Sequence, residues 1–272
     1  SSYAFSPNTR QSVAIGLMGG LLLGLVIAVA RESLDTRVRG ADDLPEGVRI
    51  IAEVEDERRL ESKHRWSRGV SKERASAIRT ESYRKLRTNL RFLNVDNPVR
   101  VLVITSSLAG EGKSTTAIEL SRVLAESGER VLLIDGDLRQ PKVASYLGLE
   151  GSVGLADILA GTADVSAVTQ EWGAAGLSVL ASGSIPPNPS ELLGSRAFAD
   201  LVAKLRGEFD HVIIDSPPLL PVTDASVASV VADGVVVVIR HGRTTQRQVK
   251  TAADSLAAVE ARILGAVINA TP

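Results

Sequence analysis

The stretch Val101-Leu-Val-Ile-Thr-Ser-Ser-Leu-Ala-Gly-Glu-Gly-Lys-Ser-Thr-Thr116 gives the strongest indication of how this chain folds. Its apolar first half predicts a buried strand. A glycine-containing loop and a helix follow, which is the order of a phosphate-binding loop. The glycines let the backbone approach phosphate oxygens, and the amides at the start of the helix supply donors at its positive end. We therefore expect a nucleotide site, with Lys113 at the outer phosphates and the Ser114 hydroxyl on Mg²⁺.

The loop is a variant of the usual GxxxxGK[ST] pattern, because Ser107 stands where the first glycine is expected. The residues expected to surround the phosphates are Ala109, Gly110, Glu111, Gly112, Lys113, Ser114 and Thr115. The plainer alternative is a glycine-containing turn followed by a surface lysine. The strand before the loop and the helix after it favour the phosphate site.

Two further apolar runs end in aspartate, in Leu132-Leu-Ile-Asp-Gly-Asp-Leu-Arg139 and Val212-Ile-Ile-Asp-Ser-Pro-Pro218. Ligands of parallel sheets bind beyond the carboxyl ends of the strands, so these carboxylates are expected beside the phosphate loop. We expect Asp215 and Ser114 to flank Mg²⁺, and Asp137 to accept a proton from an attacking hydroxyl or water. Turn capping is the alternative for Asp135 and Asp137. Arg139 could either neutralise phosphate charge or pair with an aspartate.

From Val99 onward the pattern alternates between strands and helices. Continuous apolar strands between helices predict an α/β fold of the P-loop NTPase type, with a mostly parallel sheet covered by helices on both faces. Strands are expected near Val48–Val54, Val99–Thr105, Val131–Asp135, Leu177–Ala181, Val212–Asp215, Val235–Arg240 and Ile263–Asn269. Helices are expected near Ser71–Leu93, Lys113–Glu126, Ser190–Arg206 and Gln246–Val259.

The bulk composition narrows the class of protein. With 272 residues, of which 44% are hydrophobic, the chain can bury a sizeable core. Aromatic residues make up 3% and the net charge is −1, so we expect no nucleic-acid partner. Cysteine is absent, which fits a reducing compartment and excludes thiolate metal sites.

The run from Val13 to Ala30 contains no charged residue and would span about 27 Å as a helix. We expect a transmembrane helix, bracketed by Arg10 and Arg31, with the portion after it in the cytosol. A signal peptide and a buried core helix are the alternatives. Export would place the nucleotide site outside the cell, which argues against the signal peptide. Because residue 1 is Ser and the only methionine is Met18, we expect the chain to be cut from a longer one.

The segment after this helix is basic. Residues 58–91 contain twelve Lys and Arg against three Glu, which favours contact with anionic membrane lipid. The expected domains are a membrane helix with flanks (1–35), a juxtamembrane linker (36–71) and a cytosolic nucleotide-binding domain (72–272). Within the helix expected at Ser71–Leu93, the three-residue spacing of Glu81-x-x-Arg84-x-x-Arg87 places both arginines close to the face of the helix that carries the glutamate. A solvated face with intrahelical pairs is the alternative for these three residues.

Several motifs together resemble the bacterial tyrosine kinases, P-loop autokinases fused to or partnered with polysaccharide copolymerases. The shared segments are the phosphate loop, both aspartate strand ends, the ExxRxxR motif at Glu81, Pro186-Pro-Asn-Pro-Ser-Glu-Leu-Leu193 and Pro221-Val-Thr-Asp-Ala225. The resemblance covers about residues 72–272. The run at Val13–Ala30 is similar to the second membrane helix that precedes such kinase domains.

The resemblance implies an ATP- and Mg²⁺-dependent protein-tyrosine autokinase in the bacterial inner membrane. Lys113 and Ser114 would hold the Mg²⁺-bound ATP, Asp135 and Asp215 would serve the metal, and Asp135 and Asp137 would activate a tyrosine hydroxyl. Asn269 would contact adenine. Glu81, Arg84 and Arg87 would build a homo-oligomeric ring, an octamer in the family. Implied partners are the capsule or exopolysaccharide polymerisation and export machinery and a cognate tyrosine phosphatase.

The tyrosine content departs from that family, whose kinases end in a tyrosine-rich tail. The tyrosines here are Tyr3, Tyr83 and Tyr146, which are not clustered. This keeps open a nucleotide-gated scaffold ATPase of polysaccharide assembly that does not phosphorylate. A partitioning or site-selection ATPase is a further alternative. Such proteins carry a signature lysine where this chain has Leu108, which counts against it.

Overall fold

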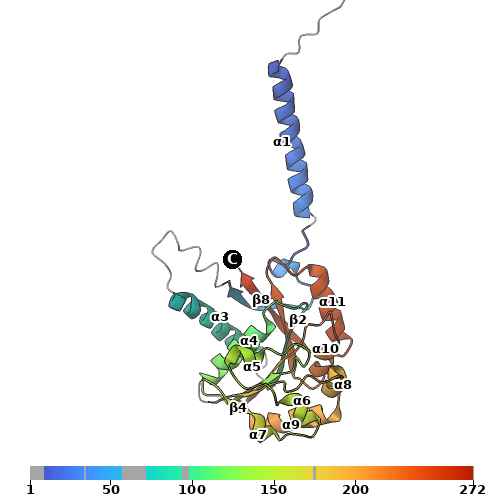
Figure 1. Cartoon of the computed structure of the whole chain (residues 1–272). Helices are drawn as coiled ribbons and strands as arrows, with labels where there is room; N and C mark the ends of the chain where they lie inside the picture. The colour runs from blue at the N-terminus through green and yellow to red at the C-terminus, as the bar shows by residue number, and fades with distance from the viewer. Residues whose placement is uncertain (1–8, 34, 57–71, 94–97, 174–175, 272) are drawn as a thin grey trace, which may run out of the picture. The chain divides into compact units, whose positions relative to one another are not determined.

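The structure is a computed structural model, and it describes residues 9–33, 35–56, 72–93, 98–173 and 176–271. The chain divides into two compact units, Ser1–Thr36 and Arg37–Pro272, which are described separately (Figure 1).

The first unit contains helix α1 (Thr9–Ser33). Its large apolar side chains between Val13 and Val29 are exposed. Across the described residues, none of the helices combines the length and the apolar character needed to cross a membrane. The span expected at Val13–Ala30 therefore stays a prediction.

The second unit is built on a twisted sheet. Its described residues form eight strands in the order β1-β8-β7-β2-β6-β3-β5-β4. Neighbouring strands are parallel except β4, which runs antiparallel to β5. The strands are β1 (Ile50–Glu55), β2 (Val101–Ser106), β3 (Val131–Asp135), β4 (Gln170–Glu171), β5 (Leu177–Leu180), β6 (His211–Asp215), β7 (Gly234–Arg240) and β8 (Ile263–Thr271). The predicted α/β fold with a mostly parallel sheet is confirmed.

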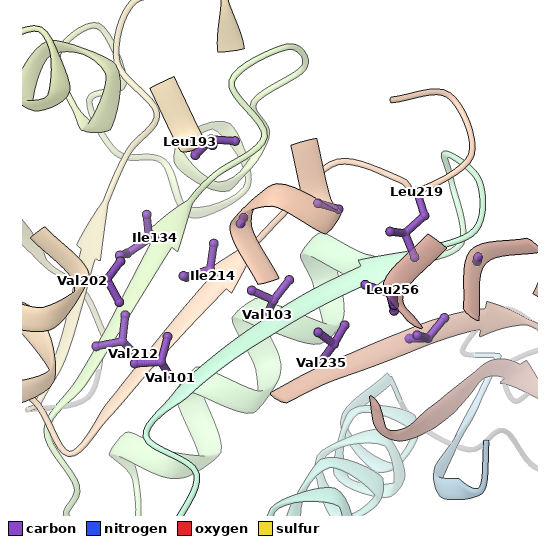
Figure 2. Packing of buried hydrophobic residues seen from close by; sticks show 14 of the residues in the cluster. Val101, Val103, Ile134, Leu193, Val202, Val212, Ile214, Leu219, Val235 and Leu256 are labelled. Carbon is purple, nitrogen blue, oxygen red and sulfur yellow. The ribbon is translucent and has the colours of Figure 1, made fainter. Parts of the chain in front are cut away.

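Helices cover both faces of this sheet (Figure 1). They are η1 (Ala41–Asp43), α3 (Lys72–Phe92), α4 (Lys113–Ala125), α5 (Val143–Leu147), α6 (Leu155–Leu159), α7 (Val165–Val168), α8 (Pro189–Leu193), α9 (Arg196–Glu208), α10 (Asp224–Ser229) and α11 (Gln246–Ala257). Alternate side chains of β2 enter opposite cores, because successive residues of a strand point to opposite faces. Leu102 and Ile104 pack with α3 and α4. Val101 and Val103 pack with α9, α10 and α11, as Figure 2 shows around Val202 and Leu256.

The helix expected at Ser190–Arg206 is in fact two helices, α8 and α9. The break comes at Gly194 and Ser195. Ser195 Oγ accepts a hydrogen bond from the Phe198 N–H at 3.2 Å and so caps α9. An N-terminal cap satisfies an amide that would otherwise lack a partner, which favours a new helix start at this serine.

Residues 37–55 differ from the linker expected at 36–71, because they fold as part of the second unit. Strand β1 pairs in parallel with β8, and its Ile51 and Val54 are buried. Ahead of β1, Val38 is fully buried and its N–H donates to Thr244 O at 2.8 Å. Burial of these apolar side chains holds the segment against the sheet. The rest of the expected linker, including much of its basic stretch, lies outside the described residues.

Candidate functional site

The phosphate loop joins the end of β2 to the start of α4. Gly112 is the residue before α4 and has φ 102°, a conformation that residues with a Cβ rarely adopt. A Cβ at this position would lie 2.0 Å from Asn269 Nδ2. The backbone angle therefore favours glycine here, and any Cβ would also displace the Asn269 side chain.

Lys113, the first residue of α4, lies among carboxylates. Its Nζ is 2.8 Å from Asp137 Oδ2, 3.6 Å from Asp215 Oδ1 and 3.4 Å from Ser114 Oγ. Burial acts to lower the pKa of Lys113, but Asp215 and Asp137 outweigh it and the pKa is raised. The lysine is therefore charged at neutral pH, and it offsets part of the negative charge of the carboxylates around it.

Asp215, at the end of β6, is fully buried. Neither of its carboxylate oxygens accepts a hydrogen bond from the described part of the chain. Burial raises the pKa of Asp215 to about 6, against the opposing charge of Lys113. A buried carboxylate whose oxygens accept no hydrogen bond, next to Lys113 and Ser114, fits a magnesium ligand, because Mg²⁺ prefers carboxylate and hydroxyl oxygens. The residues present thus fit the expected metal.

The turn after β3 brings Asp135 and Asp137 to the same edge. Gly136 between them donates its N–H to Asp215 O at 2.7 Å, and a Cβ on Gly136 would lie 3.0 Å from that oxygen. This close approach explains the glycine between the two aspartates. The predicted meeting of the two strand ends beside the phosphate loop is present in the structure.

The two aspartates differ in their contacts. Asp135 is fully buried, and its oxygens accept the N–H groups of Asp137, Lys142 and Val143 at 3.3, 3.0 and 2.9 Å. Burial, followed by the charge of Asp215, raises the pKa of Asp135 to about 7. Asp137 Oδ1 accepts the Gln140 N–H at 3.0 Å while Oδ2 contacts Lys113. Both residues therefore cap the turn, and Asp137 also keeps one oxygen on the lysine.

The side chain of Asn269 binds the backbone carbonyl of Glu111 in the phosphate loop. Asn269 Nδ2 donates to Glu111 O at 2.8 Å, so in this structure the amide expected at adenine binds the phosphate loop. The Glu111 side chain is buried, and its Oε2 accepts the Leu108 N–H at 2.8 Å. The Thr244 hydroxyl donates to Glu111 Oε1. Thr244 was missed by sequence reasoning, because it lies far along the chain in a loop without a motif.

The loop, the turn after β3 and the segment after β6 enclose a cavity of about 620 Å³. This volume lies within the range of small-ligand sites. The cavity is lined by Ala109, Gly110, Gly112, Lys113, Ser114, Thr115, Asp137, Arg139 and Asn269, and also by Tyr146 and Pro217 among others. The structure thus brings most of the predicted nucleotide-contacting residues to one cavity. Glu111 is not part of the lining, because its side chain faces the protein interior.

The expected assembly residues lie away from this cavity on α3. Glu81 and Arg84 are more than half exposed and form an intrahelical pair, with 3.6 Å between Glu81 Oε2 and Arg84 Nη1. Arg87 differs, because its Nη1 donates to Val123 O in the last turn of α4 at 2.8 Å. Arg87 therefore has an intramolecular contact in addition to its predicted role.

Arg139 pairs with a carboxylate that the sequence analysis did not single out. Its Nε is 2.7 Å from Asp224 Oδ2, and its Nη2 is 3.1 Å from Asp224 Oδ1. Of the two expectations for Arg139, the structure shows the pairing with an aspartate. Asp224 belongs to Pro221-Val-Thr-Asp-Ala225, so a signal existed, but its partner could not be read from the chain.

Comparisons with known proteins agree with this geometry. A family model described as an AAA domain matches residues 99–263. The chain is 43% identical over 193 residues to the tyrosine-protein kinase YwqD of Bacillus subtilis (strain 168), covering 71% of this chain and 81% of that protein. Relatives that match nearly the whole chain are longer, and this chain covers 36% to 39% of their length.

Solved structures give the same picture. The kinase domain of the Escherichia coli tyrosine kinase ETK is similar with a TM-score of 0.74 and 30% identity, over 82% of this chain and 90% of that chain. The septum site-determining protein MinD complexed with Mg-ADP, from Pyrococcus horikoshii OT3, is similar with a TM-score of 0.55 and 26% identity, over 62% of this chain and 70% of that chain. The similarity to the kinase domain is thus greater and extends over more of the chain.

Proposed function

Because the chain belongs to the bacterial tyrosine-protein kinases, and is therefore an enzyme of that class, we propose that it transfers the γ-phosphate of ATP to tyrosine hydroxyls in a Mg²⁺-dependent reaction. The observation that carries the proposal is the placement of Lys113. It lies on the phosphate loop between Asp137 and Asp215, with Ser114 beside it.

The lysine's contacts suggest how the residues act. Without nucleotide, Lys113 neutralises Asp137 Oδ2. When phosphates enter the loop they compete for the same ammonium group, so the Lys113–Asp137 contact weakens. The released oxygen of Asp137 is then available to accept the proton of the tyrosine hydroxyl. The hydroxyl oxygen attacks the γ-phosphorus of ATP, the bond from that phosphorus to the bridging oxygen breaks, and ADP is the leaving group.

Asp215 and Ser114 would hold Mg²⁺, and Asp135 would support them through the turn that it caps. The metal, when bound, neutralises charge on the phosphate oxygens. Asn269 would lie at the adenine end of the cavity, where Asn269 and Ala270 form part of the wall.

An Asp215→Asn variant tests this assignment. It keeps the shape of the side chain but removes a ligand charge, so the Mg²⁺ concentration needed for half-maximal activity should rise by about tenfold or more. The matched control is Asp200→Asn, which removes an exposed carboxylate on α9 that lies 3.8 Å from Arg196. An unchanged Mg²⁺ dependence in a folded Asp215→Asn protein would show that Asp215 is not a ligand of the metal.

We also propose that Val13–Ala30 anchors the kinase in the bacterial inner membrane, with the second unit in the cytosol. The support is the uncharged run itself and the basic residues that follow it. Residues 1–40 fused to a reporter should fractionate with membranes and resist carbonate extraction, with the reporter on the cytosolic side. A soluble product, or cleavage after Ala30, would contradict the anchor.

The family resemblance further supports a ring of copies that regulates capsule or exopolysaccharide polymerisation and export. A cognate phosphatase would reverse the phosphorylation. Strains carrying Lys113→Met should then produce polymer of altered length or amount. Polymer identical to that of the wild-type strain would show that the kinase activity does not regulate this machinery.

A further inference from the structure

Three segments at the carboxyl end of the sheet meet at the carboxylate of Asp224. Arg139 lies in the turn after β3, Ser190 lies in α8, and Asp224 is the first residue of α10. Two of these residues belong to the segments Pro186–Leu193 and Pro221–Ala225, which the resemblance identified but the proposed mechanism does not use.

The contacts at this carboxylate are well defined. Arg139 donates from Nε to Asp224 Oδ2 at 2.7 Å and from Nη2 to Oδ1 at 3.1 Å. The Ser190 hydroxyl also donates to Oδ1. Two parallel N–H···O bonds fix the plane of a guanidinium as well as its position. A lysine at 139 would be a point charge and could not be oriented in this way.

The two partners differ in exposure. The side chain of Asp224 is 0% exposed, whereas that of Arg139 is 42% exposed. A buried carboxylate without a partner is strongly unfavourable, so Asp224 holds the guanidinium firmly. Arg139 in turn lines the same cavity as Lys113 and Ser114. Within the described residues, no hydrogen bond holds Arg139 Nη1.

We propose that Asp224, supported by Ser190, is a positioning residue that fixes Arg139 at the wall of the nucleotide cavity, with Nη1 free to donate to a phosphate oxygen. This inference rests on the proposed function, because it takes the cavity to be the ATP site. Arg139 lies two residues after Asp137, the proposed proton acceptor. The Arg139–Asp224 pair therefore also holds the turn after β3 against the segment after β6.

The test is a double-mutant cycle on the full chain, read out as the affinity for ATP in the presence of Mg²⁺. Asp224→Asn should weaken ATP binding by roughly 10- to 100-fold, because a charge-assisted hydrogen bond from Arg139 to phosphate is lost when the guanidinium is no longer held in place. Arg139→Met should weaken it by at least as much. If Asp224 acts through Arg139, adding Asp224→Asn to Arg139→Met should cause little further loss.

The chain offers a matched control in Asp210. It forms the same two-bond pair with Arg130, with Nε to Oδ2 at 3.3 Å and Nη2 to Oδ1 at 2.9 Å, at the opposite end of β6. Asp210→Asn should leave ATP affinity unchanged. Ser190→Ala serves as a milder variant if Asp224→Asn fails to fold. It should weaken ATP binding in the wild-type background and not in the Arg139→Met background.

Two results would overturn the inference. One is unchanged ATP affinity in folded Asp224→Asn protein or, where that variant does not fold, in Ser190→Ala. The other is a full additional loss in the Arg139→Met background, which would mean that these residues serve only the fold. Tyrosine phosphorylation is measured on the same proteins. A wild-type chain that binds ATP but never modifies tyrosine refutes the kinase proposal, while the binding cycle still decides the role of Asp224.

Discussion

Glu111 occupies the middle of the phosphate loop, yet its carboxylate faces the protein rather than the cavity. Glu111 is 4% exposed, and its carboxylate accepts hydrogen bonds from the Leu108 N–H and from the Thr244 hydroxyl. Thr244 Oγ1 also accepts the Arg240 N–H at 3.0 Å. The glutamate therefore braces the loop against the segment after β7, a role separate from phosphate contact.

The ionisation of this glutamate should affect stability. Burial raises the pKa of Glu111 above its ordinary value of 4.5. In a folded protein with a raised carboxyl pKa, the stability contribution is fully present below the unfolded value and is lost as pH rises through the folded value. Glu111→Gln carries no such charge. The free energy of unfolding of this variant, relative to wild type, should therefore increase as pH rises above about 4.5 and then level off.

Urea unfolding at a series of pH values measures this difference. Glu53→Gln on β1, where the glutamate is exposed, is the control for removing a carboxylate from the surface. A difference between Glu111→Gln and wild type that stays constant across pH would show that the carboxyl does not titrate differently in the folded state.

The residue types at the site could be predicted from the sequence, but several of their contacts could not. The glycine loop and the strand-end aspartates carry local signals, because each follows an apolar run. The bond of Asn269 to Glu111 O and the pairing of Arg139 with Asp224 join residues far apart in the chain. Such partners depend on how loops approach one another after folding, and no local pattern encodes that approach.

Helix α3 shows how one element can serve two purposes. Its buried face carries Tyr83 and Leu86, which pack against the core that α4 shares. Its exposed face carries Glu81 and Arg84. Arg87 lies between these faces and binds the carbonyl of Val123 near the end of α4. Changing both arginines at once would therefore mix a stability effect with an assembly effect.

Single variants separate these effects. Arg87→Met should lower the free energy of unfolding by about 1 kcal/mol, because a carbonyl near the end of α4 loses a side-chain donor. Arg84→Met should lower the free energy of unfolding by less than about 0.5 kcal/mol, since an exposed intrahelical ion pair at this spacing contributes only about 0.2–0.5 kcal/mol. Arg84→Glu should weaken self-association in a salt-sensitive manner while ATP binding persists. An unaltered oligomer in light scattering would show that Arg84 belongs to a solvent-exposed helix face and not to an assembly contact.

Element prediction succeeded where the apolar pattern was long. The core strands β2, β3, β6 and β7 were expected within two residues of their observed limits, because continuous apolar runs identify buried parallel strands. The short helices α5, α6, α7 and α10 and the strand β4 were not predicted. They span only two to six residues, which is too short for a helical or strand periodicity to develop.

At the scale of the whole molecule, the second unit begins at Arg37, well before the phosphate loop. Strand β1 completes the sheet at β8, and Ile51 is 4% and Val54 1% exposed. Gly265 on β8 accommodates this packing, since a Cβ there would lie 2.5 Å from Ile51 Cγ2. The segment ahead of the phosphate-loop domain is therefore part of its core.

Two truncations test this statement. A chain that starts at Arg37 should have the stability of the second unit in the full chain. A chain that starts at residue 57 loses the buried side chains ahead of it, among them Val38, Ile51 and Val54, and exposes the edge of β8. Its unfolding free energy should therefore fall by about 3 kcal/mol or more. It should also aggregate more readily. Equal thermal stability of the two truncated proteins would show that β1 is dispensable.

In the proposed reaction Lys113 holds the outer phosphates of ATP while the γ-phosphate passes to a tyrosine hydroxyl. The most direct measurement is phosphoamino-acid analysis after incubation with Mg²⁺, γ-labelled ATP and a random Glu-Tyr copolymer. The wild-type chain and Lys250→Met, an exposed lysine on α11, should label tyrosine. Lys113→Met should fold but give no label, because the cation at the outer phosphates is gone. Absence of labelled tyrosine with folded, ATP-binding wild-type protein, or equal labelling by Lys113→Met, would contradict the account.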